Sequence, residues 1–243
     1  MDIQRNPNPE QQEEFQRFGW QFRIQHIVLF SSVIMLVVTG VPMWLALGEP
    51  GHIKADTATM SAFGDLQVYR DLHKFSGVVL TVVAIYHLLY LAFSREGRRE
   101  FMALMPMVKD ITDVIQNIMF FAFMTNKRPK FGRFTYYEKF DYWAVYWGCV
   151  IMIGTGLILW FPAFFGQFMP QWLGYEMSLA VHADEAILAF LALFVWHFYN
   201  VHYKPSKFPG SRTWINGKIT REEMLEEHPL EYEQMLKQKQ EKS

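Results

Sequence analysis

The amino-acid sequence predicts an all-α integral membrane protein, a four-helix bundle with both termini in the cytoplasm. Three observations support this prediction: four long apolar segments, an uneven distribution of lysine and arginine, and histidines that recur inside the apolar segments. The chain has 243 residues, 51% of them hydrophobic, and a formal net charge of −1. The net charge is close to zero, so we expect no nucleic-acid partner. The uneven distribution of lysine and arginine along the chain concerns membrane topology instead.

Each apolar segment is about 20 residues or longer, enough for a helix to cross a hydrocarbon core of about 30 Å. A soluble helical protein would show a polar stripe on each helix, but Val78–Leu91 and Ile187–Phe198 have none. The first span is expected to end at Thr39-Gly40-Val41-Pro42, the third at Trp160-Phe161-Pro162, and the fourth at Lys204-Pro205. The four predicted spans are Ile24–Leu47, Leu72–Phe93, Tyr142–Phe161 and Met177–His202.

Lysine and arginine gather in the N-terminal arm, in the connection between spans 2 and 3, and in the C-terminal tail. The other side has only Lys54, Arg70 and Lys74, and the loop between spans 3 and 4 has none. The positive-inside rule therefore predicts a multi-pass protein of the inner (cytoplasmic) membrane with both termini cytoplasmic. We expect no cleavable signal peptide, because the first apolar run follows a polar arm and is too long for an h-region.

The chain divides into a polar cytoplasmic arm (1–23), a membrane domain (24–203) and a charged cytoplasmic tail (204–243). Segment Ser94–Asn126 has helical periodicity broken by Pro106, and we predict an interfacial helix between spans 2 and 3, its Met, Phe and Ile facing lipid or the bundle. The arm is expected to be loose, with a short amphipathic turn at Phe15–Trp20. Arg221–Gln240 is expected to be one surface helix, and Glu49–Asp65 an external loop. We find no internal repeat of fixed period.

The only cysteine is Cys149, which makes no disulfide framework. The C-x-x-C-H signature of covalently bound haem and the cysteine spacing of iron–sulfur clusters are both absent. We interpret Cys149 as a small packing residue inside span 3.

Two histidine pairs of nearly matched spacing indicate the function. His73 and His87 are fourteen residues apart, and His182 and His197 are fifteen apart. On an α-helix either interval returns the side chain to within about 60° of the same face, roughly 21–22 Å further along the axis. Two such helices side by side offer one histidine pair near each membrane face, which is the arrangement that two stacked haems require.

The predicted topology sorts the histidines by side. His73 and His182 form the natural outer pair. On the inner side, the spacing from His182 makes His197 one member of the pair. The other member is either His87, because of its spacing from His73, or His26, because of its depth in the membrane. Imidazole on both sides of an iron leaves no open position, so such a haem carries electrons and does not bind oxygen. A zinc site would need three or four converging ligands and is less favoured.

Residues next to His73 have two interpretations each. Arg70 and Lys74 either pair with haem propionates or extend to the interface. Gly77, on the same helical face, and Gly154 and Gly156 in span 3 either admit a flat macrocycle close to the backbone or mark close helix packing. Asp184 and Glu185 lie beside His182. They either orient its imidazole, contact a partner, or are solvated.

The chain resembles the cytochrome b (gamma) subunit of respiratory formate dehydrogenases and the related membrane cytochrome b of nickel–iron hydrogenases. The resemblance covers all four spans in order. The matching stretches are Arg23-Ile24-Gln25-His26, Leu72-His73-Lys74-Phe75-Ser76-Gly77, Thr155-Gly156-Leu157-Ile158-Leu159-Trp160-Phe161-Pro162, Val181-His182-Ala183 and His197-Phe198-Tyr199.

This resemblance implies a four-helix membrane bundle with two b haems, the outer one held by His73 and His182 and the inner one by His26 and His197. It also implies that electrons enter from an external iron–sulfur protein and leave to a quinone near the inner haem. On this interpretation the chain is a non-catalytic or quinone-reactive subunit of an oxidoreductase complex.

Three features depart from that family. The span 4 pair is one residue wider than expected, which on an α-helix rotates His197 by about 100°. The asparagine that the family associates with the quinone pocket is replaced by Thr135. His87 is additional, and its spacing from His73 resembles the cytochrome b of quinol–cytochrome c reductases. His87 therefore either replaces His26 or serves a quinone or a third haem; three haems would make His202 a ligand candidate too.

The leading hypothesis is a transmembrane dihaem cytochrome b that passes electrons between an external partner and the membrane quinone pool. The alternatives are a self-contained membrane reductase for an external acceptor and a haem-free membrane anchor. The partner, an iron–sulfur or a multihaem cytochrome subunit, and the direction of electron flow stay open. Candidate quinone neighbours lie near the inner end of span 3: Tyr136, Glu138, Lys139, Asp141 and Trp143.

Overall fold

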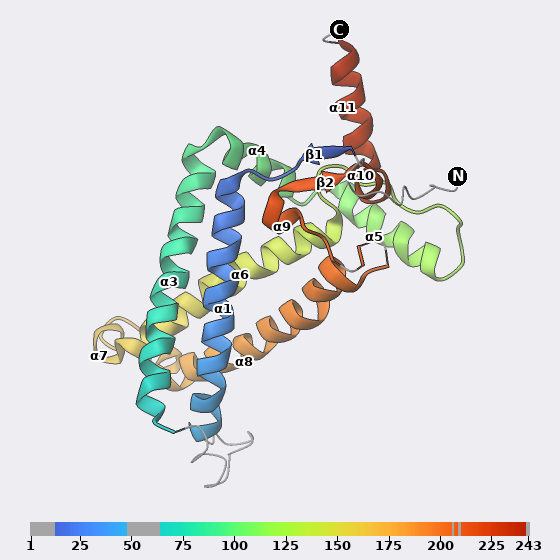
Figure 1. Cartoon of the computed structure of the whole chain (residues 1–243). Coiled ribbons are helices and arrows are strands. Elements are labelled where there is room, and N and C mark those ends of the chain that lie inside the picture. The colour runs from blue at the N-terminus through green and yellow to red at the C-terminus, as the bar shows by residue number, and fades with distance from the viewer. Residues whose placement is uncertain (1–12, 48–63, 206, 209, 242–243) are drawn as a thin grey trace. The chain divides into compact units, whose positions relative to one another are not determined.

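The computed structural model describes residues 13–47, 64–205, 207–208 and 210–241 (Figure 1). The chain forms two compact units. One unit contains both ends of the chain and is called the terminal unit; it comprises Met1–Arg23, Tyr90–Ala144 and His197–Ser243. The other is called the bundle unit; it comprises Ile24–Leu89 and Val145–Trp196. The expected external loop Glu49–Asp65 lies almost wholly outside the described residues.

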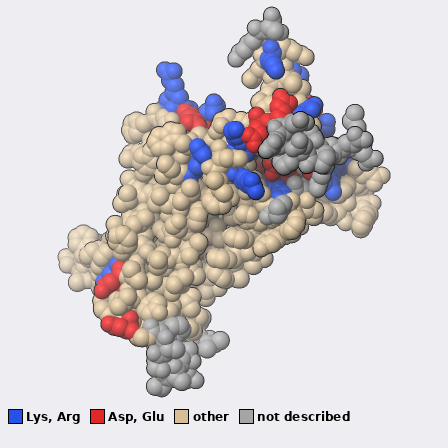
Figure 2. Space-filling view, viewed as in Figure 1, with Lys and Arg blue, Asp and Glu red and all other residues tan. Residues whose placement is uncertain are grey.

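Four long helices correspond to the four predicted spans: α1 (Trp20–Leu47), α3 (Leu66–Phe93), α6 (Tyr136–Trp160) and α8 (Tyr175–Leu191), the last extended to Tyr203. Each is long and apolar enough to cross a membrane. Large apolar side chains point outward from the bundle unit; Val82 is 61% exposed and Leu188 also 61%. Figure 2 shows the corresponding uncharged surface, which suits contact with lipid tails.

Helix α1 does not end at Thr39-Gly40-Val41-Pro42, so that prediction was wrong. The helix continues through Pro42 to Leu47. A proline in a membrane helix removes one backbone hydrogen bond without ending the helix when neighbouring groups compensate. The continuation keeps Thr39 and Gly40 in helical geometry, where both contact a histidine of α3.

The other two end signals were correct. Helix α6 ends at Trp160, and the short helix α7 (Pro162–Phe165) starts with the proline in its first turn. A turn of 3-10 helix, η2 (Gln171–Leu173), precedes α8. The fourth span ends at Tyr203, directly before Lys204-Pro205.

The fourth span changes its helical type partway along. After α8 it continues as two π-helical segments, η3 (Ala192–His197) and η4 (Tyr199–Tyr203). A π-helical turn closes its hydrogen bond one residue later than an α-helical turn, and it commonly occurs at functional sites.

The terminal unit contains a two-stranded antiparallel sheet that the sequence did not predict. Strand β1 (Glu14–Gln16) pairs with β2 (Lys218–Thr220), with Phe15 opposite Ile219. Ile219 is buried, and Phe15 packs edge-on against Tyr232. The arm expected to be loose is therefore held to the C-terminal tail over these residues.

The connection between α3 and α6 was predicted as an interfacial helix whose periodicity breaks at Pro106. The structure has two helices on either side of that proline: α4 (Arg95–Leu104) and α5 (Val108–Phe121). The tail forms α9 (Thr213–Asn216), α10 (Arg221–Glu227) and α11 (Pro229–Glu241). The prediction of one helix over Arg221–Gln240 was wrong, because His228 precedes a proline and adopts φ −132°, ψ 49°.

A buried ion network joins the segments of the terminal unit. Arg17 reaches Glu231 of α11 at 2.6 Å, and Arg133 reaches Glu231 at 2.8 Å and Glu100 of α4 at 2.9 Å. His228, 1% exposed, donates from Nδ1 to the carbonyl oxygen of Gly132 and lies 3.0 Å from the Arg17 guanidinium. Burial lowers the pKa of His228, so this histidine stays neutral while both arginines are paired.

Candidate functional site

His73 of α3 and His182 of α8 face one another inside the bundle unit. Their ring centroids are 6.2 Å apart and their planes make an angle of 66°. The two histidines predicted to form the outer pair are thus brought together.

A threonine holds each of these rings from a different helix. The Thr39 hydroxyl of α1 lies 3.0 Å from Nδ1 of His73, and the Thr155 hydroxyl of α6 lies 2.8 Å from Nδ1 of His182. Each hydroxyl also donates to the carbonyl four residues earlier, Met35 or Ile151, at 2.7 Å.

These contacts determine the tautomer of both histidines. A hydroxyl has one hydrogen, and each threonine directs it to a backbone carbonyl. The hydroxyl oxygen therefore accepts from the imidazole, so Nδ1 carries the proton. Nε2 is left with its lone pair, which is the state that a metal ligand requires.

Glycines next to the threonines make room for the two imidazoles. A Cβ atom on Gly40 would lie 3.3 Å from Cε1 of His73, and one on Gly156 would lie 3.4 Å from Cε1 of His182. At Gly77 and Gly154 a Cβ would meet no atom within 4 Å. Of the glycines singled out in the sequence, only Gly156 therefore adjoins the pair, and Gly40 was missed because it was interpreted as a helix end.

The geometry fits one metal ion between two imidazoles. A metal–imidazole bond is about 2.0–2.1 Å and the nitrogen lies about 1.1 Å from the ring centre, so the two centroids of a bis-histidine site are about 6.3 Å apart. The observed 6.2 Å agrees with this value. Among the described residues no cluster of three or more His, Cys, Asp or Glu side chains offers a metal site. A pair of imidazoles is the protein ligand set of a bis-histidine haem.

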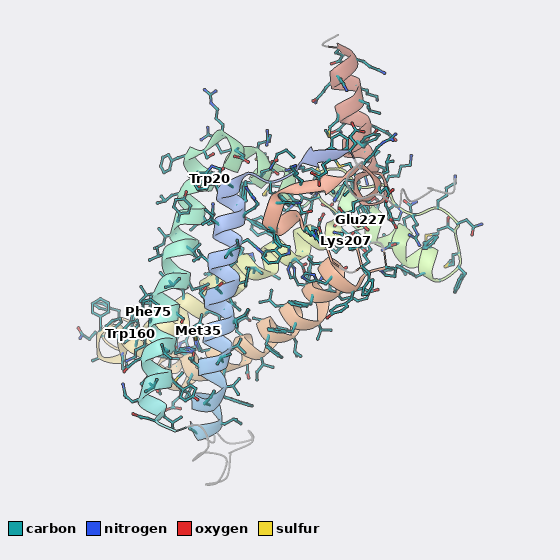
Figure 3. All side chains as sticks on the ribbon, viewed as in Figure 1. Trp20, Met35, Phe75, Trp160, Lys207 and Glu227 are labelled. Carbon is teal, nitrogen blue, oxygen red and sulfur yellow. The ribbon has the colours of Figure 1, made fainter. Side chains whose placement is uncertain are left out.

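The cations beside His73 make other contacts. Arg70 donates to Gln67 at 3.0 Å, and the Lys74 ammonium lies 5.3 Å from the ring centroid of Trp160. Figure 3 marks Trp160 and Phe75 in this part of the bundle unit. That Arg70 and Lys74 pair with haem propionates therefore stays a prediction.

His87 and His26 lie toward the other ends of α3 and α1. Nδ1 of His87 is 2.8 Å from Oε1 of Gln25, an oxygen that can only accept, so Nδ1 again carries the proton. The ring centroid of His26 lies 5.6 Å from that of Phe30. The structure thus gives His87 the same orienting contact that it gives the outer pair.

His197 ends the first π-helical segment and belongs to the terminal unit. Its Nδ1 lies 3.2 Å from a carboxylate oxygen of Asp141 on α6. Such carboxylate–histidine contacts orient metal ligands and raise their basicity.

The π-helix removes the rotation expected from the wider spacing of span 4. A π-helix turns by about 80° per residue, against 100° for an α-helix. Nine α-helical and six π-helical steps lead from His182 to His197, and together they turn the chain by about 1,380°. This is within about 20° of the fourteen α-helical steps between His73 and His87.

Of the five candidate quinone neighbours, only Asp141 contacts a predicted ligand. Lys139 pairs with Asp110 at 2.9 Å, and Trp143 donates to the Leu104 carbonyl. The Tyr136 hydroxyl accepts from Asn117 at 2.7 Å. Glu138 caps the start of α6 through Thr135, which is fully buried.

One turn before Asp141, a second polar cluster was not predicted from the sequence. Lys204 donates to Glu227 at 2.6 Å and to the Tyr137 hydroxyl at 3.0 Å, and Tyr137 donates to Glu227. Figure 3 shows Glu227 beside Lys207. Burial alone would raise the pKa of Glu227, but Lys204 and Lys207 hold this pKa at about 2. No sequence signal joins residues 137, 204 and 227, because they come from three separate segments.

The chain is similar to known proteins over most of its length. Residues 17–207 match the family model of prokaryotic cytochrome b561. The chain is 25% identical over 175 residues to the cytochrome b556 subunit of the nitrate-inducible formate dehydrogenase of Escherichia coli K12, covering 72% of this chain and 74% of the relative. The corresponding subunits of Escherichia coli O157:H7 and Shigella flexneri match equally well. The chain therefore belongs to the prokaryotic cytochrome b561 family.

Proposed function

We propose that the chain is a transmembrane dihaem cytochrome b subunit that passes electrons between an external redox partner and the membrane quinone pool. Membership of a cytochrome b family implies haem b. The relatives named above are formate dehydrogenase subunits, so an iron–sulfur subunit of such a complex is the partner that we infer. The partner and the direction of electron flow are parts of this proposal.

The contact between His73 and His182 carries the proposal. Two imidazoles, each with Nδ1 protonated and Nε2 available, face one another at the separation of a bis-histidine ligand pair. When bound, haem b supplies a one-electron redox centre without an open coordination position. His73 and His182 would hold that centre, and Thr39 and Thr155 would orient the two histidines.

The inner haem is proposed to use His197 and a second histidine. Asp141 orients His197 through Nδ1, as the threonines orient the outer pair. Asp141 is also the one candidate quinone neighbour in contact with a predicted ligand, which supports a quinone site at this end of α6. Reduction of the bound haem by a quinol analogue in the purified protein tests that site.

We further propose that both termini are cytoplasmic and that α5 lies in the inner membrane interface. Figure 2 shows lysine and arginine concentrated on the terminal unit, which supports this orientation by the positive-inside rule. Labelling single cysteines from either side of the membrane, in the two termini, checks the orientation.

The first experiment is the number of b haems per polypeptide, from pyridine haemochrome absorbance and protein mass. We expect two in the wild type and one in His73→Ala and in His182→Ala, because each substitution removes an axial ligand of the outer haem. Phe75→Ala is the matched control, because Phe75 lies two residues from His73 and is 67% exposed.

Each other outcome has a definite meaning. A wild-type protein without haem would show that the histidines serve only as hydrogen-bonding groups between helices. It would favour the haem-free membrane anchor. Two haems in both histidine variants would exclude His73 and His182 as ligands. Reduction of an external acceptor by quinol without any other subunit would favour the self-contained reductase.

A further inference from the structure

A buried hydroxyl of the bundle unit has no hydrogen-bond partner within the described part of the chain. Ser178, in α8, is 2% exposed, and its Oγ makes no hydrogen bond to any residue that the structure describes. Its backbone N–H is satisfied, because it donates to the Gly174 carbonyl at 3.0 Å. The side-chain hydroxyl is therefore the group whose burial is left uncompensated.

Other hydroxyls of the membrane helices bond within their own helix. Three threonines donate to the carbonyl four residues earlier at 2.7 Å: Thr39, Thr81 and Thr155. Ser32 donates to the carbonyl three residues earlier, also at 2.7 Å. This back-bonding satisfies a hydroxyl in an apolar helix without any other group. Ser178 does not form such a bond, so its hydroxyl is available to an acceptor that is not part of the helix.

Ser178 lies one helical turn outward from His182. Residues four apart on an α-helix share a face and are about 6 Å apart along the axis. His182 faces His73 inside the bundle unit, so the buried Ser178 lies on the same side of α8 as the histidine pair. Each histidine is the eighth residue of its helix, and Ser178 is the fourth of α8. The hydroxyl therefore lies between the pair and the end of the bundle at which α3 and α8 begin.

A haem held by His73 and His182 would bring acceptors to this place. Haem b has propionate groups at one edge, and an ionised carboxylate only accepts hydrogen bonds. Because ionised carboxylates are costly within hydrocarbon, the propionate edge is expected to face the nearer aqueous boundary. In the bundle unit that boundary lies at the start of α3 and α8, which is the side of the pair on which Ser178 lies.

We propose that Ser178 donates its hydroxyl hydrogen to a propionate of the outer haem. The acceptor that satisfies this buried hydroxyl is then the cofactor and not the chain. Hydrogen bonds to an ionised acceptor are stronger than those between neutral groups, so the bond anchors the haem edge in addition to the two histidines at the iron. This inference rests on the proposed function, because it requires the outer haem.

Two hydroxyl deletions in the same unit test the proposal. Ser178→Ala removes the hydroxyl without a partner in the chain. Ser32→Ala is the matched control, because Ser32 is 5% exposed and bonds within its own helix. In the haem-loaded protein, Ser178→Ala should make one of the two haems transfer to excess apomyoglobin about 10-fold faster. It should also shift a propionate band in the resonance Raman spectrum, and Ser32→Ala should change neither.

The haem-free protein should respond differently to the same variants. Ser178 has no hydrogen bond to lose there, so Ser178→Ala should keep or raise the midpoint of thermal unfolding. Ser32→Ala should lower that midpoint with and without haem, because it loses a bond within the chain. Ser178→Cys, whose S–H is a weak donor, should fall between serine and alanine in the rate of haem transfer.

The proposal is overturned if Ser178→Ala releases haem no faster than Ser32→Ala, or if it leaves the propionate band unchanged. A lower unfolding midpoint of the haem-free Ser178→Ala protein would overturn it as well, because the serine would then act through helix packing. These results would leave haem binding and the proposed function intact. A wild-type protein without haem would remove the function and this inference together, so the two failures are distinguishable.

Discussion

At the scale of single residues, two threonine hydroxyls determine which nitrogen of each outer histidine can bind a metal. Thr39 and Thr155 direct their hydrogens to backbone carbonyls and accept from Nδ1 of the imidazoles. A hydrogen bond from the far side of a ligating imidazole fixes its orientation and strengthens it as a ligand. If the chain holds the two haems proposed above, the threonines are positioning residues for the outer one.

Replacing Thr39 by valine should weaken haem binding without creating a cavity between the helices. Valine keeps the shape but removes the hydroxyl that accepts from the part-buried Nδ1–H of His73, which leaves the Leu36 backbone carbonyl as its acceptor. We expect the outer haem to bind about 10–100-fold more weakly, and its potential to rise because the histidine is a weaker donor. The rate of haem transfer to excess apomyoglobin and a redox titration measure the two effects.

Two further variants separate positioning from packing. Thr39→Ser restores the hydroxyl and should restore haem retention and potential. Thr81→Val removes a hydroxyl of α3 that donates to the Gly77 carbonyl at 2.7 Å, and should change neither. Equal haem loss in Thr39→Val and Thr81→Val would show that the threonine acts through packing alone.

Histidine spacing and the predicted topology singled out His73 and His182, which the structure brings together, but not the groups that hold them. The interval between histidines on one apolar helix is a local property, so the sequence contains it. The acceptors Thr39, Thr155 and Gln25 come from other helices, and their contacts depend on how the helices pack. Those acceptors were consequently missed, and Thr39-Gly40 was misinterpreted as a helix end.

At the scale of elements, α5 has its polar face inward and its apolar face outward. Asp110 pairs with Lys139 of α6, and Asn117 donates to Tyr136 of α6. On the other face Val108 is 80% exposed, Ile111 63% and Ile118 61%. An amphipathic helix in this orientation suits the boundary between lipid headgroups and acyl chains.

Fluorescent labels on single cysteines should therefore report different depths around α5. Cys149 is the only native cysteine, so Cys149→Ser provides the background. In vesicles containing brominated lipids, a label at Ile115→Cys should be quenched, because the apolar face of such a helix lies about 5–10 Å into the headgroup region. Glu233→Cys, at a half-exposed position of α11, is the control and should stay unquenched. Equal quenching at both positions, or none at Ile115, would contradict an interfacial α5.

The four spans were predictable because a run of about 20 consecutive apolar residues is typical of a membrane-spanning helix. The elements that were missed are short or depend on distant partners. Strands β1 and β2 have three residues each and pair across some 200 positions. The π-helical segments have no sequence signal by themselves.

At the scale of the whole molecule, polar chemistry divides between the two units. The bundle unit has an apolar surface, buries hydroxyls and half-buries imidazoles, whereas the terminal unit buries paired charges. Breaking a buried ion pair by neutralising one partner is costly, because the other charge stays buried. The stability of the terminal unit should therefore depend on pH more strongly than that of the bundle unit.

Glu227 allows this dependence to be predicted with its sign. Its pKa is about 2 in the folded protein and about 4.5 in the unfolded chain, because Lys204, Lys207 and the Tyr137 hydroxyl stabilise the ionised form. A group whose folded pKa is depressed contributes stability above the unfolded value and loses it as the pH falls through the folded value. We expect this contribution, of the order of 3 kcal/mol, to disappear between about pH 4.5 and pH 2.

Thermal unfolding of the purified protein in detergent, followed by circular dichroism between pH 7 and pH 3, measures the effect. Glu227→Gln should lower the unfolding midpoint at pH 7, because Lys204 loses its buried partner, and should flatten the decline below pH 4.5. Glu233→Gln removes a half-exposed carboxylate of the same unit, 3.7 Å from Lys130, and should follow the wild type throughout. If Glu227→Gln instead declined as steeply as the wild type, Glu227 would not be the source of the acid sensitivity, and this prediction would be wrong.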